Sequence, residues 1–223
     1  MSARDEMLAR ISAAVGSAGT GSSQARPEPG QVGAAEPAAE TAVGYRTSGE
    51  LSGAELLDLL ADRLTDYRAL VHRAAPGTLA EQISMALRRR QARRVVVPPA
   101  LALPLPDFVT ATADTPPFLS PAELDAFDGV ITRAAVAIAD TGTIVLDGSP
   151  DQGRRAISLV PDYHLCVVEA GQVVHLVPEA IARLSLGRPL TWISGPSATS
   201  DIELERVEGV HGPRTLEVVL VSG

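Results

Sequence analysis

The chain contains no lysine and only one cysteine, Cys166, among its 223 residues. A single thiol cannot form an internal disulfide, and it cannot by itself hold an iron–sulfur cluster or a cysteine-rich zinc site. Long apolar runs are also absent, since none approaches the ~20 residues that a helix needs to cross a bilayer. Asp5 and Glu6 occupy positions where a signal peptide would carry basic residues. We therefore expect a cytoplasmic protein without a membrane span.

Aromatic residues and positive charge are scarce as well. Aromatic residues make up 3% of the chain and hydrophobic residues 45%, so the core must consist mainly of Val, Leu, Ile and Ala. This composition is typical of buried parallel strands covered by Ala-rich helices. Nineteen arginines face 27 acidic residues, and the net charge is −8. We expect no nucleic-acid partner, because phosphate neutralisation needs a broad positive field.

Segments of different composition divide the chain. In residues 1–15 the apolar positions recur at helical spacing, which predicts an N-terminal amphipathic helix. Residues 16–44 are rich in Gly, Ser, Ala and Pro and have no large apolar side chain except valine, so they should form a flexible linker. Residues 45–223 carry helical and strand patterns throughout, which predicts a single α/β domain.

The order of these patterns predicts the fold class. Helices are expected at 51–74, at 78–91, from 120 and at 178–186, and strands at 95–99, 129–132, 136–139, 143–146, 164–169, 190–193 and 216–221, with a further buried strand-like run at 156–161. This order predicts an α/β fold with a mostly parallel sheet, into which the antiparallel hairpin at 135–147 is inserted.

The tip of that hairpin, Asp140-Thr141-Gly142-Thr143, matches the signature of aspartic peptidases. That chemistry needs two carboxylates that share a proton, hence a second such loop or a symmetric dimer. The chain contains no second Asp-Thr-Gly or Asp-Ser-Gly. We therefore interpret the four residues as a tight turn with Gly142 at positive φ, and we include them among the candidate ligand-binding residues.

Two adjacent arginines, Arg154 and Arg155, end the loop GSPDQGRR that follows the hairpin. The guanidinium group offers a planar fork of donors that suits a carboxylate or a phosphate, so both arginines are candidates for binding a small anionic ligand. Pairing with Asp147 or Asp151 on the surface is an equally available role.

A metal site is a weaker possibility. His164 and Cys166 share one face of an expected strand, and His175 follows nearby. Two ligands at this spacing, without a Cys-rich or acidic partner motif, are explained equally well by a half-buried strand. We predict neither a metal nor a resident cofactor.

The stretch SGPSATSDIE near the C-terminus is the strongest candidate site. Its segment Ser200-Asp201-Ile202-Glu203 fits a capping box, and Gly209 lies where a short helix would stop. A strand that ends in such a loop, followed by a helix N-terminus, is typical of anion cradles, although a capped turn is the plain alternative. The candidate ligand-binding residues here are Ser194, Gly195, Ser197, Thr199, Ser200, Asp201 and Glu203.

The candidate segments should converge if they form one pocket. We expect the loop at 194–200 to lie at the carboxyl end of the sheet, beside the turn at 140–143 and within reach of Arg154 or Arg155. His211, between two glycines, is a further candidate, either for proton transfer or as a hydrogen-bonding fixture of a turn.

Several of these motifs together resemble a known family. ISGPSATSDIE, GVHGPRTLEVVLV, IADTGTIVL and GRRAISLVPDYHLCVV, which lie between Gly129 and Val221, are similar to the lactate utilisation protein C family, the LUD-domain proteins. The resemblance implies a fold like that of glucosamine-phosphate isomerase, ribose-phosphate isomerase and the CoA-transferases. It also implies a part in oxidising L-lactate to pyruvate alongside iron–sulfur partner proteins.

Departures from the family pattern shift the expected site. The family commonly has Glu at the position of Asp140 and Arg at the position of Ala198, so an anion site here would depend on Arg154, Arg155 and the backbone. The leading hypothesis is an accessory subunit of a lactate-oxidising system. The alternative is a stand-alone enzyme of the isomerase, CoA-transferase or cyclo-ligase type that acts on a phosphorylated or carboxylated substrate.

Overall fold

A computed structural model describes residues 46–223 apart from 186, 201–205 and 209–211. The helix expected at 1–15 and the linker expected at 16–44 lie outside the described residues. The helices are α2 (Ala54–Asp66), α3 (Leu79–Arg89), α4 (Pro121–Asp125), α5 (Arg155–Leu159) and α6 (Val177–Arg183), with 3₁₀ turns η2 (Pro76–Thr78) and η3 (Ala170–Gln172). The strands are β1 (Leu70–Ala74), β2 (Arg94–Val97), β3 (Thr110–Ala113), β4 (Gly129–Arg133), β5 (Val136–Ile138), β6 (Thr143–Leu146), β7 (Tyr163–Glu169), β8 (Val173–Val174), β9 (Thr191–Ile193), β10 (Ala198–Ser200), β11 (Arg206–Glu208) and β12 (Thr215–Val221).

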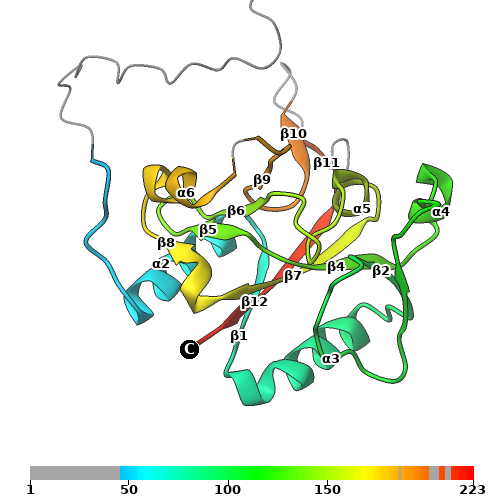
Figure 1. Cartoon of the computed structure of the whole chain (residues 1–223). Helices are drawn as coiled ribbons and strands as arrows, with labels where there is room; N and C mark the ends of the chain where they lie inside the picture. Colours follow the sequence, from blue (N-terminus) through cyan, green and yellow to red (C-terminus); the bar gives the residue numbers. More distant parts are fainter. Residues whose placement is uncertain (1–45, 186, 201–205, 209–211) are drawn as a thin grey trace, which may run out of the picture. The chain divides into compact units, whose positions relative to one another are not determined.

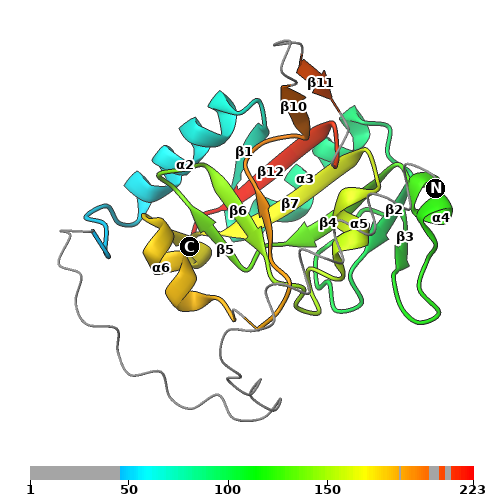
Figure 2. The same ribbon diagram turned by 90° about the horizontal axis from the view of Figure 1, so that it is seen from above.

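The central sheet has six strands in the order β1-β12-β7-β4-β2-β3 (Figures 1 and 2). Each neighbouring pair in it runs parallel. Its middle strands have the near-continuous apolar sequence that burial on both faces requires, and β7 is buried from Tyr163 to Val168. The predicted α/β class with a mostly parallel sheet is therefore confirmed.

The hairpin is not inserted into this parallel sheet, contrary to the prediction. β5 and β6 pair antiparallel and belong to a second sheet with the order β8-β5-β6-β9. Ala137 and Ile144 face the central sheet, whereas Val136 and Val145 face α6. Because the hairpin is buried on both faces, its sequence resembles that of a strand inside a parallel sheet.

Helices cover both sheets (Figures 1 and 2). Ile83 and Leu87 of α3 pack on one face of the central sheet, below it in Figure 1. The second sheet and α2 pack on the opposite face, and α5 lies against β4 on that side. Ala180 of α6 packs on the outer face of the second sheet. The second sheet is therefore enclosed between the central sheet and α6.

Some expected elements are wrong in type. The helix expected at 51–74 stops at Asp66, and β1 (Leu70–Ala74) pairs in parallel with β12 instead. Arg68 adopts φ +68° between the two elements, which ends the helix before the strand begins. The strand-like run at 156–161 is largely the helix α5, whose Ile157 packs against Val96 and Val130. Both short apolar segments fit either periodicity, and tertiary pairing decides between them.

The helix expected after Ser200 is also wrong. Ala198–Ser200 forms β10, which pairs antiparallel with β11 at Arg206–Glu208. Ser200 therefore lies in a strand, and residues 206–208, where the expected helix would continue, form β11, whereas residues 201–205 lie outside the described residues. No helix in the described part of the chain is both long enough and apolar enough to span a membrane.

Candidate functional site

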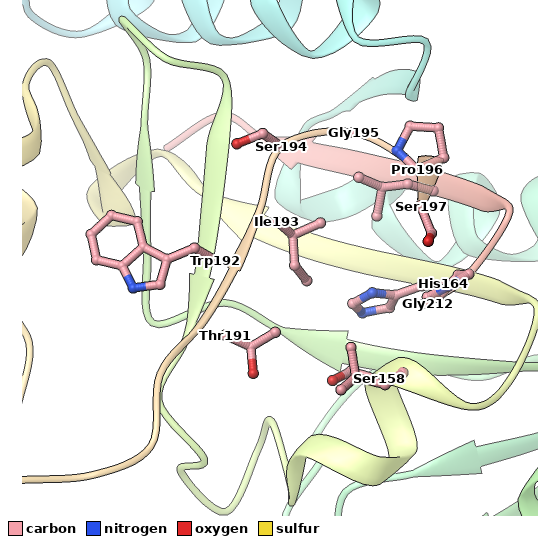
Figure 3. Close-up of a pocket in the computed structure, with 13 residues that line it drawn as sticks. Ser158, His164, Thr191, Trp192, Ile193, Ser194, Gly195, Pro196, Ser197 and Gly212 are labelled. Carbon is pink, nitrogen blue, oxygen red and sulfur yellow. The ribbon is translucent and has the colours of Figure 1, made fainter. Parts of the chain in front are cut away.

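A pocket of about 230 Å³ lies beside the Ser194 loop, which is residues 194–197 (Figure 3). It collects side chains from segments that are far apart in the sequence. The residues that line it are Ser158, Leu159, His164, Thr191, Trp192, Ile193, Ser194, Gly195, Pro196, Ser197, Gly212, Pro213 and Leu216. None of them is Asp, Glu, Lys or Arg, and His164 is the one titratable side chain among these described residues.

The pocket lies at the amino end of the central sheet, not at the carboxyl end as predicted. His164 is the second residue of β7 and Leu216 the second residue of β12, and both line the pocket. The Ser194 loop does follow the carboxyl end of a strand, but that strand is β9 of the second sheet. The prediction failed because it assumed that β9 belongs to the parallel sheet.

Three contacts fix the position of the Ser194 loop. The hydroxyl of Ser194 lies 2.8 Å from the hydroxyl of Thr143, and the backbone N–H of Ser197 donates to the carbonyl of Pro213 at 2.8 Å. Gly195 adopts φ +82°, and a Cβ there would lie 2.6 Å from the carbonyl oxygen of Tyr67. Only glycine combines this dihedral angle with this close approach.

The turn at 140–143 lies beside the loop, as the sequence predicts. Gly142 adopts φ +57° and approaches the backbone of Arg63, so the turn packs on the end of α2. The hydroxyl of Thr143 lies 2.8 Å from the hydroxyl of Thr141 and 2.8 Å from the hydroxyl of Ser194. Asp140 is exposed, and its backbone N–H donates to the carbonyl of His175. The structure thus brings the turn and the loop together, while a binding role for either stays a prediction.

Arg154 does not reach this site. Its Nε and Nη2 donate hydrogen bonds to the carboxylate of Asp114 at 2.5 and 3.1 Å. Nη2 also donates a hydrogen bond to the backbone carbonyl of Leu119. Asp114 directly follows β3 and is buried, so the pair lies at the carboxyl end of the central sheet. The partner of Arg154 is therefore Asp114, not Asp147 or Asp151, which the sequence left open as alternatives, and the hydrogen bond to Asp114 raises the pKa of the Arg154 guanidinium.

The other candidate ligand-binding residues are not among the described residues that line the pocket. Arg155 is exposed at the start of α5, and its carbonyl accepts a hydrogen bond from Ser158. Thr199 and Ser200 lie in β10, where the chain leaves the pocket. Asp201, Glu203 and His211 lie outside the described residues.

His164 is the buried polar group of the pocket. Its Nε2 lies 2.8 Å from the hydroxyl oxygen of Thr132, and the Sγ of Cys166 lies 3.8 Å from the same oxygen. Burial lowers the pKa of the imidazole from its ordinary value of 6.5 to about 4. Burial also raises the pKa of the Cys166 thiol to about 12, against a smaller opposite effect of its hydrogen bond to Thr132. Both groups are therefore uncharged near neutral pH.

His164, Cys166 and His175, which the sequence offered only as a weak possibility for a metal site, do not form one among the described residues. His175 accepts a hydrogen bond from the backbone N–H of Glu50. Within residues 46–223, outside the gaps named above, no group of three or more His, Cys, Asp and Glu side chains could hold a metal ion.

Comparison with known proteins identifies the family. The LUD domain family model matches residues 122–221, a range that includes every residue lining the pocket. "Lactate utilization protein C" of Deinococcus radiodurans is 50% identical over 183 residues, which are 80% of this chain and 85% of that protein. The chain belongs to the lactate utilization protein C family of LUD-domain proteins. The protein of the same name in Bacillus subtilis is 36% identical over 100 residues, 41% of each chain.

A solved structure shows the same fold. The crystal structure of a DUF162 family protein from Deinococcus radiodurans is 44% identical in sequence and aligns with a TM-score of 0.67. The alignment covers 77% of this chain and 99% of that chain. The arrangement of the sheets in this LUD domain therefore has an experimental counterpart.

Several pocket residues of the LUD domain could not be recognised from the sequence. Ser158 and Leu159 fall in the run read as a strand, and Leu216 reads as an ordinary core residue. The sequence pattern indicates His164 only as a weak candidate for a metal ligand. The one available signal was a polar imidazole inside the apolar strand at 164–169, because a buried polar group needs a partner or a function.

Proposed function

We propose that this protein serves L-lactate utilisation as an accessory subunit that binds a small ligand in its pocket and works with iron–sulfur partner proteins. The observation that carries the proposal is the 50% identity to the lactate utilization protein C of Deinococcus radiodurans, which extends over 80% of this chain. Identity at this level across most of both chains favours a shared physiological role over a shared fold alone.

The chemistry of the chain supports dependence on partners. Oxidation of lactate to pyruvate releases a pair of electrons, and the acceptor is usually a cofactor or a cluster. The chain has one cysteine, Cys166, and that residue is fully buried with a raised pKa. A cluster held by several thiolates therefore belongs to another protein, and the sequence has no Gly-rich dinucleotide fingerprint.

The stand-alone enzyme remains the second candidate, because the pocket is large enough for a small metabolite. The fold of the sugar-phosphate isomerases and CoA-transferases, which the family resemblance implies, is compatible with this alternative. It requires turnover by the purified chain without partners. The described lining of the pocket contains no Arg or Lys side chain, whereas phosphate sites use cationic side chains or helix N-termini. A stand-alone enzyme that acts on a phosphorylated substrate is therefore the weaker candidate.

Growth and co-purification test the proposal. Deletion of the gene should impair growth on L-lactate as sole carbon source and spare growth on glucose, and a plasmid copy should restore it. The tagged chain, purified without oxygen from cells grown on lactate, should carry associated proteins that contain iron and acid-labile sulfide. Normal growth on lactate in a strain without a second copy of the gene would refute the proposal.

A further inference from the structure

Four exposed arginines gather where α3 ends and β2 begins. They are Arg88, Arg89, Arg93 and Arg94, and we call them the arginine surface. Among the described residues, none of these four side chains forms an ion pair with Asp or Glu, whereas Arg90 between them pairs with a buried carboxylate. The arginine surface is therefore a local concentration of unpaired positive charge on a chain whose net charge is −8.

Aromatic rings hold three of these side chains in place. The Cζ atoms of Arg88 and Arg93 lie 4.2 and 5.8 Å from the centre of the Phe108 ring, so one ring holds two guanidinium groups. The Cζ atom of Arg94 lies 5.2 Å from the centre of the Phe127 ring. Phe108 itself packs against the core beneath α3. The attraction between a cation and the face of a ring orders each guanidinium group, while the N–H donors at its edge stay available to a ligand.

The acids that lie closest in the chain do not neutralise this surface. Asp128 accepts hydrogen bonds from the backbone N–H groups of Arg93 and Arg94 at 2.7 and 2.8 Å, which fixes the backbone at the start of β2. Asp107, next to Phe108, is exposed and forms no ion pair with a described residue. The four guanidinium groups therefore keep an excess of positive charge together with open hydrogen-bond donors.

We propose that the arginine surface is a docking site for an acidic segment of a partner protein, whose carboxylates bind the guanidinium groups of Arg88 and Arg93. A guanidinium group can bind a carboxylate through two parallel N–H···O bonds. A side chain that is already ordered on a ring loses less conformational freedom when it binds. An acidic protein segment is favoured over nucleic acid, because the net charge of −8 repels a long chain of phosphates more than a short run of carboxylates.

The arginine surface lies at the same end of the central sheet as the pocket. Arg94 is the first residue of β2, and the pocket residues His164 and Leu216 are the second residues of β7 and β12. Only β4 lies between β2 and β7, so these two strands are about 10 Å apart. A partner bound to the arginine surface is therefore close to the end of the sheet that carries the pocket. That this partner is a component of the lactate system rests on the proposed function, whereas the surface itself rests on the contacts of the arginines.

Peptide binding tests the surface directly. The probe is a short fluorescein-labelled oligoglutamate peptide, titrated with the full chain and followed by fluorescence anisotropy at low and at high salt. Wild type should bind the peptide, and added salt should weaken that binding. The double variant Arg88→Gln, Arg93→Gln should bind roughly 5- to 30-fold more weakly, as expected for two lost surface ion pairs. The control variant Arg68→Gln, Arg155→Gln removes the same charge from exposed positions elsewhere and should bind like wild type.

Further comparisons distinguish a ring-held guanidinium fork from charge alone and from other occupants. The variant Arg88→Lys, Arg93→Lys keeps both charges but not the planar fork, so it should bind the peptide more weakly than wild type. Equal binding by wild type and the glutamine variant would overturn the proposal, and so would tighter binding of an oligonucleotide of equal charge. A wild-type dimer in sedimentation experiments that the glutamine variant loses would assign the surface to a second copy of this chain instead.

Growth separates this inference from the proposed function. Where deletion of the gene impairs growth on L-lactate, the chromosomal variant Arg88→Gln, Arg93→Gln should impair it too, and the iron–sulfur proteins that co-purify with wild type should be lost. Normal lactate growth of that variant in such a strain would remove the docking role and leave the lactate role standing. Normal growth of the deletion strain would refute the proposed function, and the peptide titration would still decide whether the arginine surface binds acidic segments.

Discussion

The hydroxyl of Thr143 lies 2.8 Å from the hydroxyl of Ser194, although the two residues are 51 positions apart in the sequence. This contact joins the turn of the β5–β6 hairpin to the loop that lines the pocket. The same loop approaches Tyr67, and the same turn approaches Arg63, so both pack on the end of α2. The pocket therefore depends on the second sheet and α2 as much as on the central sheet.

Gly195→Ala should destabilise the fold. The residue adopts φ +82°, and the added Cβ would lie 2.6 Å from the carbonyl oxygen of Tyr67. We expect a loss of roughly 1–3 kcal/mol in the free energy of unfolding, measured by urea denaturation. Gly171→Ala is the matched control, because a Cβ there meets nothing within 4 Å. Equal stability of the two variants would contradict the close approach.

Arg154→Ala should also be destabilising, because it leaves the buried carboxylate of Asp114 without its guanidinium partner. The Asp114 side chain is 1% exposed and that of Arg154 is 32% exposed. We expect a loss of about 1–3 kcal/mol in the free energy of unfolding, detected by chemical denaturation. Arg155→Ala serves as the control, since Arg155 is exposed, and its effect should be within about 0.5 kcal/mol.

Stability should fall between pH 6.5 and pH 4 through His164. The pKa of the folded imidazole is lowered to about 4, whereas an unfolded histidine titrates near 6.5. Between these values the unfolded chain binds a proton that the folded chain does not, so acid favours unfolding. The full difference corresponds to roughly 3 kcal/mol below pH 4.

Comparison with a variant that lacks the imidazole separates the contribution of His164 to the pH dependence of stability from that of the carboxylates. The free energy of unfolding, measured at several pH values for wild type and His164→Gln, should show a steeper acid loss in wild type. Parallel pH profiles would mean that His164 titrates normally in the folded state.

Cys166 should be unreactive in the native protein. The side chain is fully buried in β7, and burial raises the pKa of its thiol to about 12. Because the thiolate is the reactive form, a thiol-specific colorimetric reagent should detect no thiol in native protein at pH 8 and one per chain in denaturant. Rapid labelling without denaturant would place Cys166 in an accessible position.

Local sequence determined much of this fold. The apolar runs of β4, β7 and β12 are strands as the sequence predicts, and the Ser120-Pro121-Ala122-Glu123 pattern starts α4 with a capping box where the sequence predicts a helix from residue 120. The turn at 140–143 required a glycine at positive φ, and Gly142 provides it. These features depend on residues that are close together in the chain, so their signals are readable from it.

Tertiary structure alone decided the rest. Leu70–Ala74 is a strand because β12 pairs with it, and Ala198–Ser200 is a strand because Arg206–Glu208 lies opposite it. The second sheet removes β9 from the parallel sheet, which moves the Ser194 loop to the amino ends of β7 and β12. Arg154 pairs with Asp114, 40 positions away, instead of with a nearby acid. Short segments satisfy several local patterns equally well, and the backbone bonds and buried charges that choose between them come from residues distant in sequence.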